Sequence, residues 1–250
     1  MTDHMGAEAF YRVKFDYHTH TDWSHGKGTI EDNVRAAAQK GLSGVAVSDH
    51  GPGHLIYGIK EEKFLPMSEE IGRLRQIYKD MDIFFSVEAN IISIDNYIDV
   101  DKDRLKAFDF IIAGYHFGVR NSHFIGNFVH NSSPFGLPGR DGLKKKNTEM
   151  TVKAIYENRI KIISHPGDKG PFDITEIANA CAERGTWLEI NEHHGYLTVE
   201  AIKQAAKTSV EFIINSDAHS PEKVGSCDVS IGMAIKAGLD MERVVNIERI

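Results

Sequence analysis

The sequence has few cysteines and no long hydrophobic run. Its two cysteines, Cys181 and Cys227, have no pairing motif around them, which argues against a disulfide framework and favours a reducing, cytoplasmic environment. No stretch approaches the roughly 20 consecutive apolar residues that a membrane-spanning helix needs. The first ten residues carry acidic side chains and no apolar segment, so they lack the features of a secretory signal. We therefore expect a cytoplasmic protein without a membrane span.

The sequence also lacks an excess of positive charge. Its formal net charge is −7 with neutral histidines, which argues against non-specific binding to nucleic acid or to anionic membranes. It has no glycine-rich loop of the Walker type, and this argues against an NTPase. The 250 residues are 41% hydrophobic and 26% charged, and we predict that they form a single globular domain. Thirteen histidines are the one unusual feature of the composition.

Short apolar runs alternate along the chain with helical patterns. The runs are continuous, which is typical of strands covered on both faces. Repeated strand–helix units indicate a parallel sheet, and seven of them could close into an α/β barrel with its site at the carboxyl ends of the strands. The predicted strands cover residues 13–17, 45–48, 83–87, 110–115, 160–164, 186–190 and 210–215. The predicted helices cover residues 31–40, 68–79, 147–157, 174–184, 198–207, 229–237 and 241–245.

A histidine or a carboxylate stands where nearly every predicted strand ends. Side chains at the carboxyl ends of neighbouring parallel strands can converge on one point, and His18 and His20 share a face because side chains alternate along a strand. Taken singly, such a histidine is more often a structural or surface group. Buried polar groups are costly without a partner, however, and a metal cluster would supply a common one. The candidate ligands are His18, His20, His25, His50, Glu88, His116, His165, Asp217 and His219.

The motifs that contain these residues follow one another in a recognisable order. They are His-Thr-His at 18–20, Ser-Asp-His-Gly-Pro at 48–52, Val-Glu at 87–88, Ser-His-Pro-Gly at 164–167 and Asp-Ala-His at 217–219. This pattern closely resembles the PHP (polymerase and histidinol phosphatase) superfamily, and the runs around His50 and His165 are most similar to its small stand-alone YcdX-like phosphatases. The resemblance covers about residues 15–219. It implies a distorted (β/α)7 barrel with up to three metal ions.

The resemblance also implies how the ligands divide among three divalent ions. One ion would take His18, His20, Glu88 and Asp217; a second would share Glu88 and take His116 and His165; a third would take His25, His50 and His219. Mostly imidazole ligation with carboxylates suits Zn, Mn or Fe. The catalytic candidates are Glu88, as the bridge between two ions, and Asp217, as a ligand that could also relay a proton.

We expect metal-dependent hydrolysis of a small phosphomonoester, with histidinol phosphate as one candidate, by a water that the ions activate. The alternative is a phosphodiesterase or 3′–5′ exonuclease acting on nucleic acid or nucleotides, which the negative charge and the lack of a basic stripe disfavour. A non-catalytic metal-binding module is a third reading, against which the complete ligand set argues. The sequence leaves a homo-oligomer open.

Residues 117–146 interrupt the alternation of strands and helices. This stretch is rich in Gly, Asn, Ser and Pro, and we predict a long loop insertion there, because loops of this length are often lids or substrate loops. Arg120 and Arg140 could grip a phosphate through paired hydrogen bonds. His54 and His194 are further candidates for substrate contacts, because both follow predicted strand ends. They are weaker candidates than the arginines.

Overall fold

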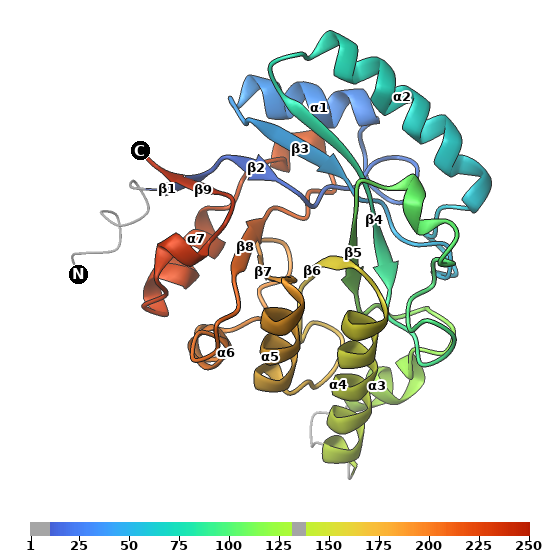
Figure 1. Cartoon of the computed structure of the whole chain (residues 1–250), viewed down its shortest axis with the longest axis vertical. Helices are drawn as coiled ribbons and strands as arrows, with labels where there is room; N and C mark the ends of the chain where they lie inside the picture. Colours follow the sequence, from blue (N-terminus) through green and yellow to red (C-terminus); the bar gives the residue numbers. More distant parts are fainter. Residues whose placement is uncertain (1–10, 132–138) are drawn as a thin grey trace.

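Seven parallel strands form one continuous sheet in the computed structural model, which describes residues 11–131 and 139–250. The strands follow one another in the order of the sequence, which is the order of a barrel wall. Figure 1 shows them curving around a common centre. The predicted (β/α)7 barrel is therefore confirmed. The strands are β2 (Phe15–Asp16), β3 (Gly44–Val47), β4 (Asp82–Asn90), β5 (Phe110–Gly114), β6 (Ile160–Ile163), β7 (Trp187–Asn191) and β8 (Phe212–Asn215).

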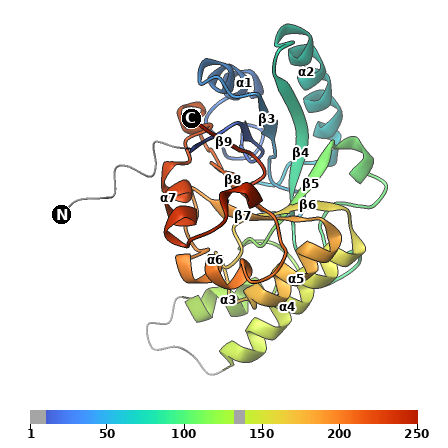
Figure 2. The same ribbon diagram turned by 60° about the vertical axis from the view of Figure 1, so that its left-hand side comes forward.

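The helices lie outside the strands, as Figures 1 and 2 show. Their sequences favour clear ends. Thr29 caps α1 in a capping box with Asp32, and α5 runs from the capping residue Asp173 to the left-handed Gly185. The helices are α1 (Ile30–Gln39), α2 (Phe64–Ile77), α3 (Phe124–Asn131), α4 (Arg140–Glu157), α5 (Ile174–Arg184), α6 (Val199–Ala205) and α7 (Asp228–Lys236). Short 3₁₀ turns are η2 (Glu61–Lys63), η3 (Leu105–Ala107), η4 (Pro221–Lys223) and η5 (Met241–Arg243).

Apolar and acidic side chains lie side by side inside the barrel. Ile112 pairs with Glu88, and Ile213 pairs with Glu189, on adjacent parallel strands. Residues paired in this way share one face of a sheet. The isoleucines form an apolar cluster with Ile162, so apolar and acidic side chains share the interior face of the barrel.

The C-terminal segment bridges the gap between the first and last strands of the sheet. Asn246, buried behind this gap, donates from Nδ2 to the carbonyls of Phe15 and Ile214, and its Oδ1 accepts the N–H of Ile214. Next to it, β1 (Tyr11–Val13) pairs antiparallel with β9 (Ile247–Arg249). A polar side chain and a two-stranded ribbon thus stand where an eighth barrel strand would run.

Several predicted element boundaries differ from the structure. The predicted strand at 13–17 is broken at Lys14, because β1 leaves the barrel wall to pair with β9. Helix α2 begins at Phe64 rather than at residue 68, since Pro66 in the first turn has no N–H that would need a helical partner. The predicted helix at 241–245 is the 3₁₀ turn η5.

The predicted loop at 117–146 is wrong in part. It contains α3 and the beginning of α4, while residues 132–138 lie outside the described part of the chain. Asn127, within the predicted loop, and Asn147, the first residue of the predicted helix at 147–157, exchange side-chain hydrogen bonds of 3.1 and 2.8 Å between these two helices. Both asparagines are fully buried. Their polarity is satisfied inside the fold rather than by solvent.

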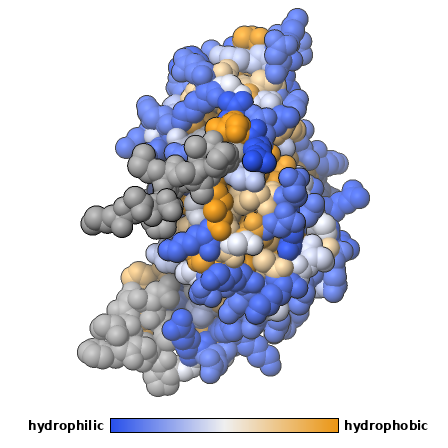
Figure 3. Space-filling view, turned by 90° about the vertical axis from the view of Figure 1, so that its left-hand side faces the viewer, coloured by the Kyte–Doolittle hydropathy of each residue, from blue (hydrophilic) through white to orange (hydrophobic). Residues whose placement is uncertain are grey.

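The outer surface is mainly polar. Figure 3 shows hydrophilic residues over much of one face, with hydrophobic residues gathered near its middle. In the described part of the chain, no helix combines the length and the apolar character that crossing a membrane would require.

Candidate metal centre

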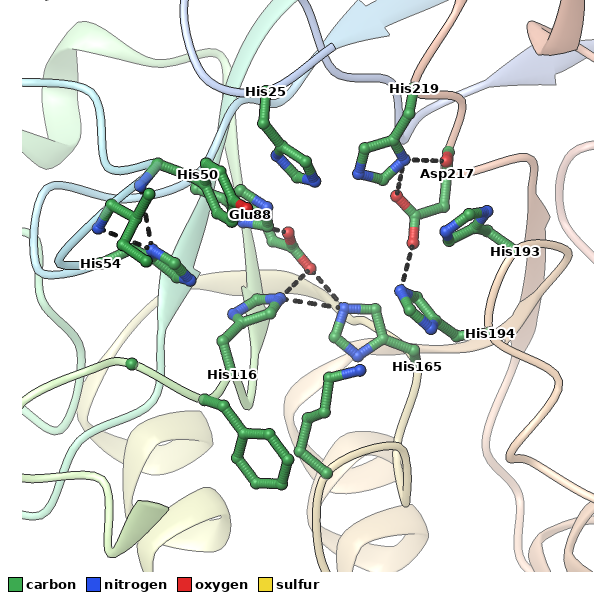
Figure 4. Close-up of a pocket in the computed structure, with 15 residues that line it drawn as sticks. His25, His50, His54, Glu88, His116, His165, His193, His194, Asp217 and His219 are labelled. Atoms are coloured by element: carbon green, nitrogen blue, oxygen red, sulfur yellow. Dashed lines mark hydrogen bonds and ion pairs between the residues drawn. The ribbon is translucent and has the colours of Figure 1, made fainter. Parts of the chain in front are cut away.

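A pocket of about 390 Å³ contains most of the predicted metal ligands. Figure 4 shows their side chains pointing toward one another from different parts of the barrel rim. His18 and His20 are fully buried and contact the residues of the pocket from inside. The predicted ligands that line the pocket are His25, His50, Glu88, His116, His165, Asp217 and His219.

Strand ends place most of these side chains, as the sequence predicted. Strand β5 ends at Gly114 and is followed by His116, and β6 ends at Ile163, two residues before His165. Glu88 differs, because β4 continues to Asn90 and the carboxylate projects from within the strand. Gly114 leaves room for it: a Cβ at this position would lie 2.8 Å from Glu88 Oε1. The glycine is therefore required by the approach of the carboxylate.

Glu88 lies at the centre of one group of ligands. Its Oε1 is 2.7 Å from His165 Nε2 and 3.3 Å from His116 Nε2, and its Oε2 is 2.9 Å from His50 Nδ1. His116 Nε2 and His165 Nε2 are 3.2 Å apart. One carboxylate therefore faces imidazoles from three different strands, which is the geometry of a bridging ligand.

Asp217 is the centre of a second group. Its Oδ1 is 3.1 Å from His20 Nε2 and 3.6 Å from His18 Nε2. The ligand atoms of three sets of side chains lie within 4.8 Å of one another, and each set could hold an ion. The sets are His18, His20 and Asp217; His50, Glu88 and His116; and His20, His25, His50 and His219.

Hydrogen bonds on the outer ring nitrogens show which nitrogens are available for a metal. Nδ1 of His18 lies 2.9 Å from Glu189 Oε1, Nδ1 of His116 lies 2.8 Å from Asn90 Oδ1, and Nδ1 of His219 lies 2.8 Å from the carbonyl of Asp217. Each of these partners is an acceptor, so Nδ1 carries the proton in the neutral ring. Nε2 then presents its lone pair to the pocket, as in a metal-ligating imidazole.

Two buried carboxylate oxygens lack hydrogen-bond donors in the described part of the chain and so also fit a metal centre. Glu88 Oε2 and Asp217 Oδ1 are buried and have no hydrogen-bond donor among the described residues, although imidazole nitrogens lie close to both. These two oxygens thus face imidazole nitrogens at close range without a hydrogen bond to them. A divalent cation satisfies such a set.

Glu189 supports two of the ligands and was not predicted. This fully buried carboxylate on β7 accepts from His18 Nδ1 and Asn215 Nδ2 at Oε1, and from the His165 N–H and Asn191 Nδ2 at Oε2. Its sequence signal is an acid within the apolar run Trp-Leu-Glu-Ile of a strand. Another buried acid, Asp49, accepts hydrogen bonds from Thr21 and Ser24 and thereby holds the loop that follows His20.

Burial and the neighbouring charges shift the pKa values of the ligands in two directions. Burial lowers the pKa of His25 and of His116 to about 3. Burial also acts against protonation of His165, but Glu88 more than offsets it and raises the pKa of His165 to about 9. Burial disfavours ionised Glu88, yet the imidazoles around it hold its pKa well below the usual value. Ions entering the site would compete with a proton at His165.

Two ligands occupy strained backbone positions. His165 has φ = 26° and Asp217 has φ = 51°, in the left-handed region that costs residues other than glycine about 1–3 kcal/mol. Both stand at the turns that follow β6 and β8. Strain of this kind persists where the surrounding structure fixes a functional geometry, and here it aims both side chains at the pocket.

The candidates for substrate contacts divide into two pairs. His54 and His194 line the pocket, whereas Arg120 and Arg140 are exposed and lie outside its described lining. Arg140 is the first residue of α4, and Arg120 belongs to a turn after an isolated bridge, so neither is held toward the metal ligands. The cation that does line the pocket is Lys169, which the sequence analysis did not single out.

Sequence relatives carry a consistent description. A protein of Shewanella baltica (strain OS195) named "Probable phosphatase" is 34% identical over 187 residues, which are 72% of this chain and 62% of that protein. A "Probable phosphatase" of Shewanella sp. (strain MR-4) is 29% identical over 246 residues, which are 92% of this chain and 86% of that protein. The chain thus spans about three fifths of the length of the S. baltica relative.

Solved structures share the fold. Histidinol phosphate phosphatase from Lactococcus lactis, complexed with Zn, L-histidinol and phosphate, has a TM-score of 0.56 and 18% identity, with 91% of this chain and 94% of that chain covered. A HisK protein of Listeria monocytogenes gives 0.61 and 16%, with 85% and 98% covered. The family model described as "PHP domain" matches residues 16–216, so this chain belongs to the PHP domain family.

Proposed function

We propose that the chain hydrolyses phosphate monoesters of small molecules with the help of metal ions held in the pocket. The observation that carries this proposal is the fixed orientation of His18, His116 and His219. Acceptors hold Nδ1 of each ring, and Nε2 of His18 and of His116 lies 3.4 and 3.3 Å from Oε1 of the buried Glu88. The names of the relatives and of the L. lactis protein support a phosphatase, and histidinol phosphate is one candidate substrate.

We propose that the pocket holds three ions. We assign His18, His20, Glu88 and Asp217 to the first, Glu88, His116 and His165 to the second, and His25, His50 and His219 to the third, with Zn, Mn or Fe as the metal. When bound, the ions would lower the pKa of water at the site and offset the charge of the phosphoryl group. Oε1 of Glu88 lies 3.4 Å from Nε2 of His18, in the first set, and 2.7 and 3.3 Å from Nε2 of His165 and His116, in the second, which supports its role as the bridge between two ions.

Asp217 is the proposed proton relay. Its Oδ2 lies 3.7 Å from His194 Nε2, and the His194 side chain is 24% exposed. A proton taken up at this carboxylate therefore has a path toward the open side of the pocket. The alternative, a phosphodiesterase or exonuclease, is less favoured because the net charge is −7 and a basic groove along which a strand could bind is not seen among the described residues.

The test combines metal analysis with a substrate screen. Metal-replete protein should release phosphate from members of a phosphomonoester panel that includes histidinol phosphate, and should act more slowly on a diester and on single-stranded DNA. Glu88→Ala should lose both bound metal and activity, because one carboxylate serves two ions. Glu183→Ala, an exposed acid on α5, is the matched control and should retain both. Phosphate release by Glu88→Ala at the unaltered rate would refute the assignment.

A further inference from the structure

The pocket contains a cation that the proposed metal centre does not use. Lys169 lines the pocket, and among the described lining residues it is the one lysine or arginine. Its side chain is 27% exposed, so it borders both the protein and the open volume. Lys169 follows the metal-ligand motif Ser-His-Pro-Gly by two positions.

A buried carboxylate holds this cation in place. Lys169 Nζ lies 2.6 Å from Asp168 Oδ2, and the Asp168 side chain is only 1% exposed. Neither oxygen of Asp168 has a hydrogen bond among the described residues. A buried charge without a partner is expensive, so the ion pair constrains where the ammonium group can be.

Contacts connect this ion pair to the metal ligands. Asp168 Oδ2 is 3.4 Å from His194 Nδ1, and His194 Nε2 is 3.7 Å from Asp217 Oδ2. The imidazole of His194 therefore separates the ion pair from a ligand of the proposed first ion. Since Lys169 lines the same pocket as Asp217 and His165, its ammonium group lies at the edge of the cluster.

The backbone around Lys169 is also fixed. The N–H of Asp168 donates to the carbonyl of His165, which closes a tight turn. Just beyond it, a Cβ at Gly170 would come within 2.5 Å of Asn127 Oδ1, and Asn147 donates to the carbonyl of Pro171. Asn127 of α3 and Asn147 of α4 thus contact the residues that directly follow Lys169.

We propose that Lys169 binds the non-bridging oxygens of the substrate's phosphoryl group, that Asp168 is its positioning residue, and that the pair favours dianionic phosphate monoesters over monoanionic diesters. This inference rests on the proposed function. A phosphate monoester carries about 1.5 to 2 negative charges at pH 7, because its second pKa is about 6. A lysine acts on it as a compact point charge, so it stabilises a dianion more than a monoanion.

Substitution of the lysine tests the first part. Lys169→Gln in metal-loaded protein should weaken the binding of inorganic phosphate about 10-fold or more, the expected effect of losing a hydrogen bond to a charged group. It should raise KM for p-nitrophenyl phosphate more than that for bis-p-nitrophenyl phosphate, and metal content should stay unchanged. Lys203→Gln is the matched control, since Lys203 on α6 forms an exposed ion pair with Glu200.

A double-mutant comparison tests the role of Asp168. Asp168→Asn should lower the selectivity for monoester over diester when Lys169 is present and should not lower it further in the Lys169→Gln background. An equal decrease in both backgrounds would contradict positioning through Lys169. Unchanged phosphate affinity and KM in Lys169→Gln, with or without a lower melting temperature, would overturn the proposal and leave the lysine a purely structural role.

Phosphate binding separates this inference from the proposed function. Isothermal titration calorimetry with inorganic phosphate needs no turnover. If the unaltered protein binds phosphate but cleaves no ester, and Lys169→Gln binds it more weakly, the catalytic proposal fails while the assignment of Lys169 stands. If the unaltered protein and Lys169→Gln cleave esters equally well, the catalytic proposal stands and the assignment of Lys169 fails.

Discussion

At the scale of single residues, the metal centre depends on groups that are not ligands. Glu189 and Asn90 accept from Nδ1 of His18 and His116, so they determine which nitrogen of each ring faces the pocket. Most of the candidate ligands could be predicted because they follow strand ends in short motifs; Glu88, within β4, is an exception. Glu189 could not, because an acid within an apolar strand shows no partner until the barrel closes and brings β2, β6 and β7 together.

Replacing Glu189 tests this supporting role. Glu189→Gln keeps the shape but replaces one of the two accepting oxygens by an NH2 group, which cannot accept from the donors that face it. We therefore expect metal affinity to fall about 10- to 100-fold. Metal competition titration with a chromogenic chelator measures the change. Glu200→Gln, an exposed acid on α6, should leave the affinity unchanged, and equal affinity in both variants would show that Glu189 does not orient the ligands.

At the scale of elements, the apolar runs predicted the seven barrel strands. Helices with a clear capping residue, such as α1 and α5, were predicted close to their observed bounds. The prediction failed at α3 and at the beginning of α4, where composition suggested a loop. Asn127 and Asn147 are satisfied by each other and by Tyr115 and Pro171. Such long-range partners leave no periodic signal in the sequence.

The cap of α1 should make a measurable contribution to stability. The helix follows the loop that carries His25. Thr29 accepts the N–H of Asp32, and the Asp32 carboxylate accepts the N–H of Thr29. Thr29→Ala should lower the free energy of unfolding by about 1 kcal/mol, which corresponds to a melting temperature about 2–4 °C lower. Differential scanning calorimetry would show it. Thr175→Ala on α5 keeps a cap intact and should shift melting much less.

At the scale of the whole molecule, the side chain of Asn246 helps to join the first and last strands of the barrel wall. Asn246→Ala would leave the N–H of Ile214 and the carbonyls of Phe15 and Ile214 without these partners. Each unsatisfied buried group costs about 1–3 kcal/mol, so urea denaturation should show a loss above about 3 kcal/mol. Asn179→Ala on the exposed face of α5 serves as the control. A loss below about 1 kcal/mol would mean that closure does not depend on Asn246.

Metal removal should also act on the molecule as a whole. Candidate ligands on or just after β2, β3, β4, β5, β6 and β8 meet in one pocket, so bound ions would join distant parts of the chain. A single ion at 100 times its dissociation constant stabilises the folded state by about 2.7 kcal/mol, so chelation should lower the melting temperature by at least roughly 5–10 °C. Adding the metal back should reverse the shift. Identical melting curves with and without chelator would argue against bound ions in the purified protein.

The span of the ligand set along the chain has a consequence during synthesis. His18 and His219 contribute to the same pocket, and Asn246 then bridges strands β2 and β8. At about 5–20 residues per second, a ribosome needs roughly 10–40 s to pass from the first of these histidines to the second. For all that time the early imidazoles are without their later partners, so a nascent chain can hold at most part of its metal complement. We therefore expect loading of the full set of ions to follow the synthesis of the segment that carries His219.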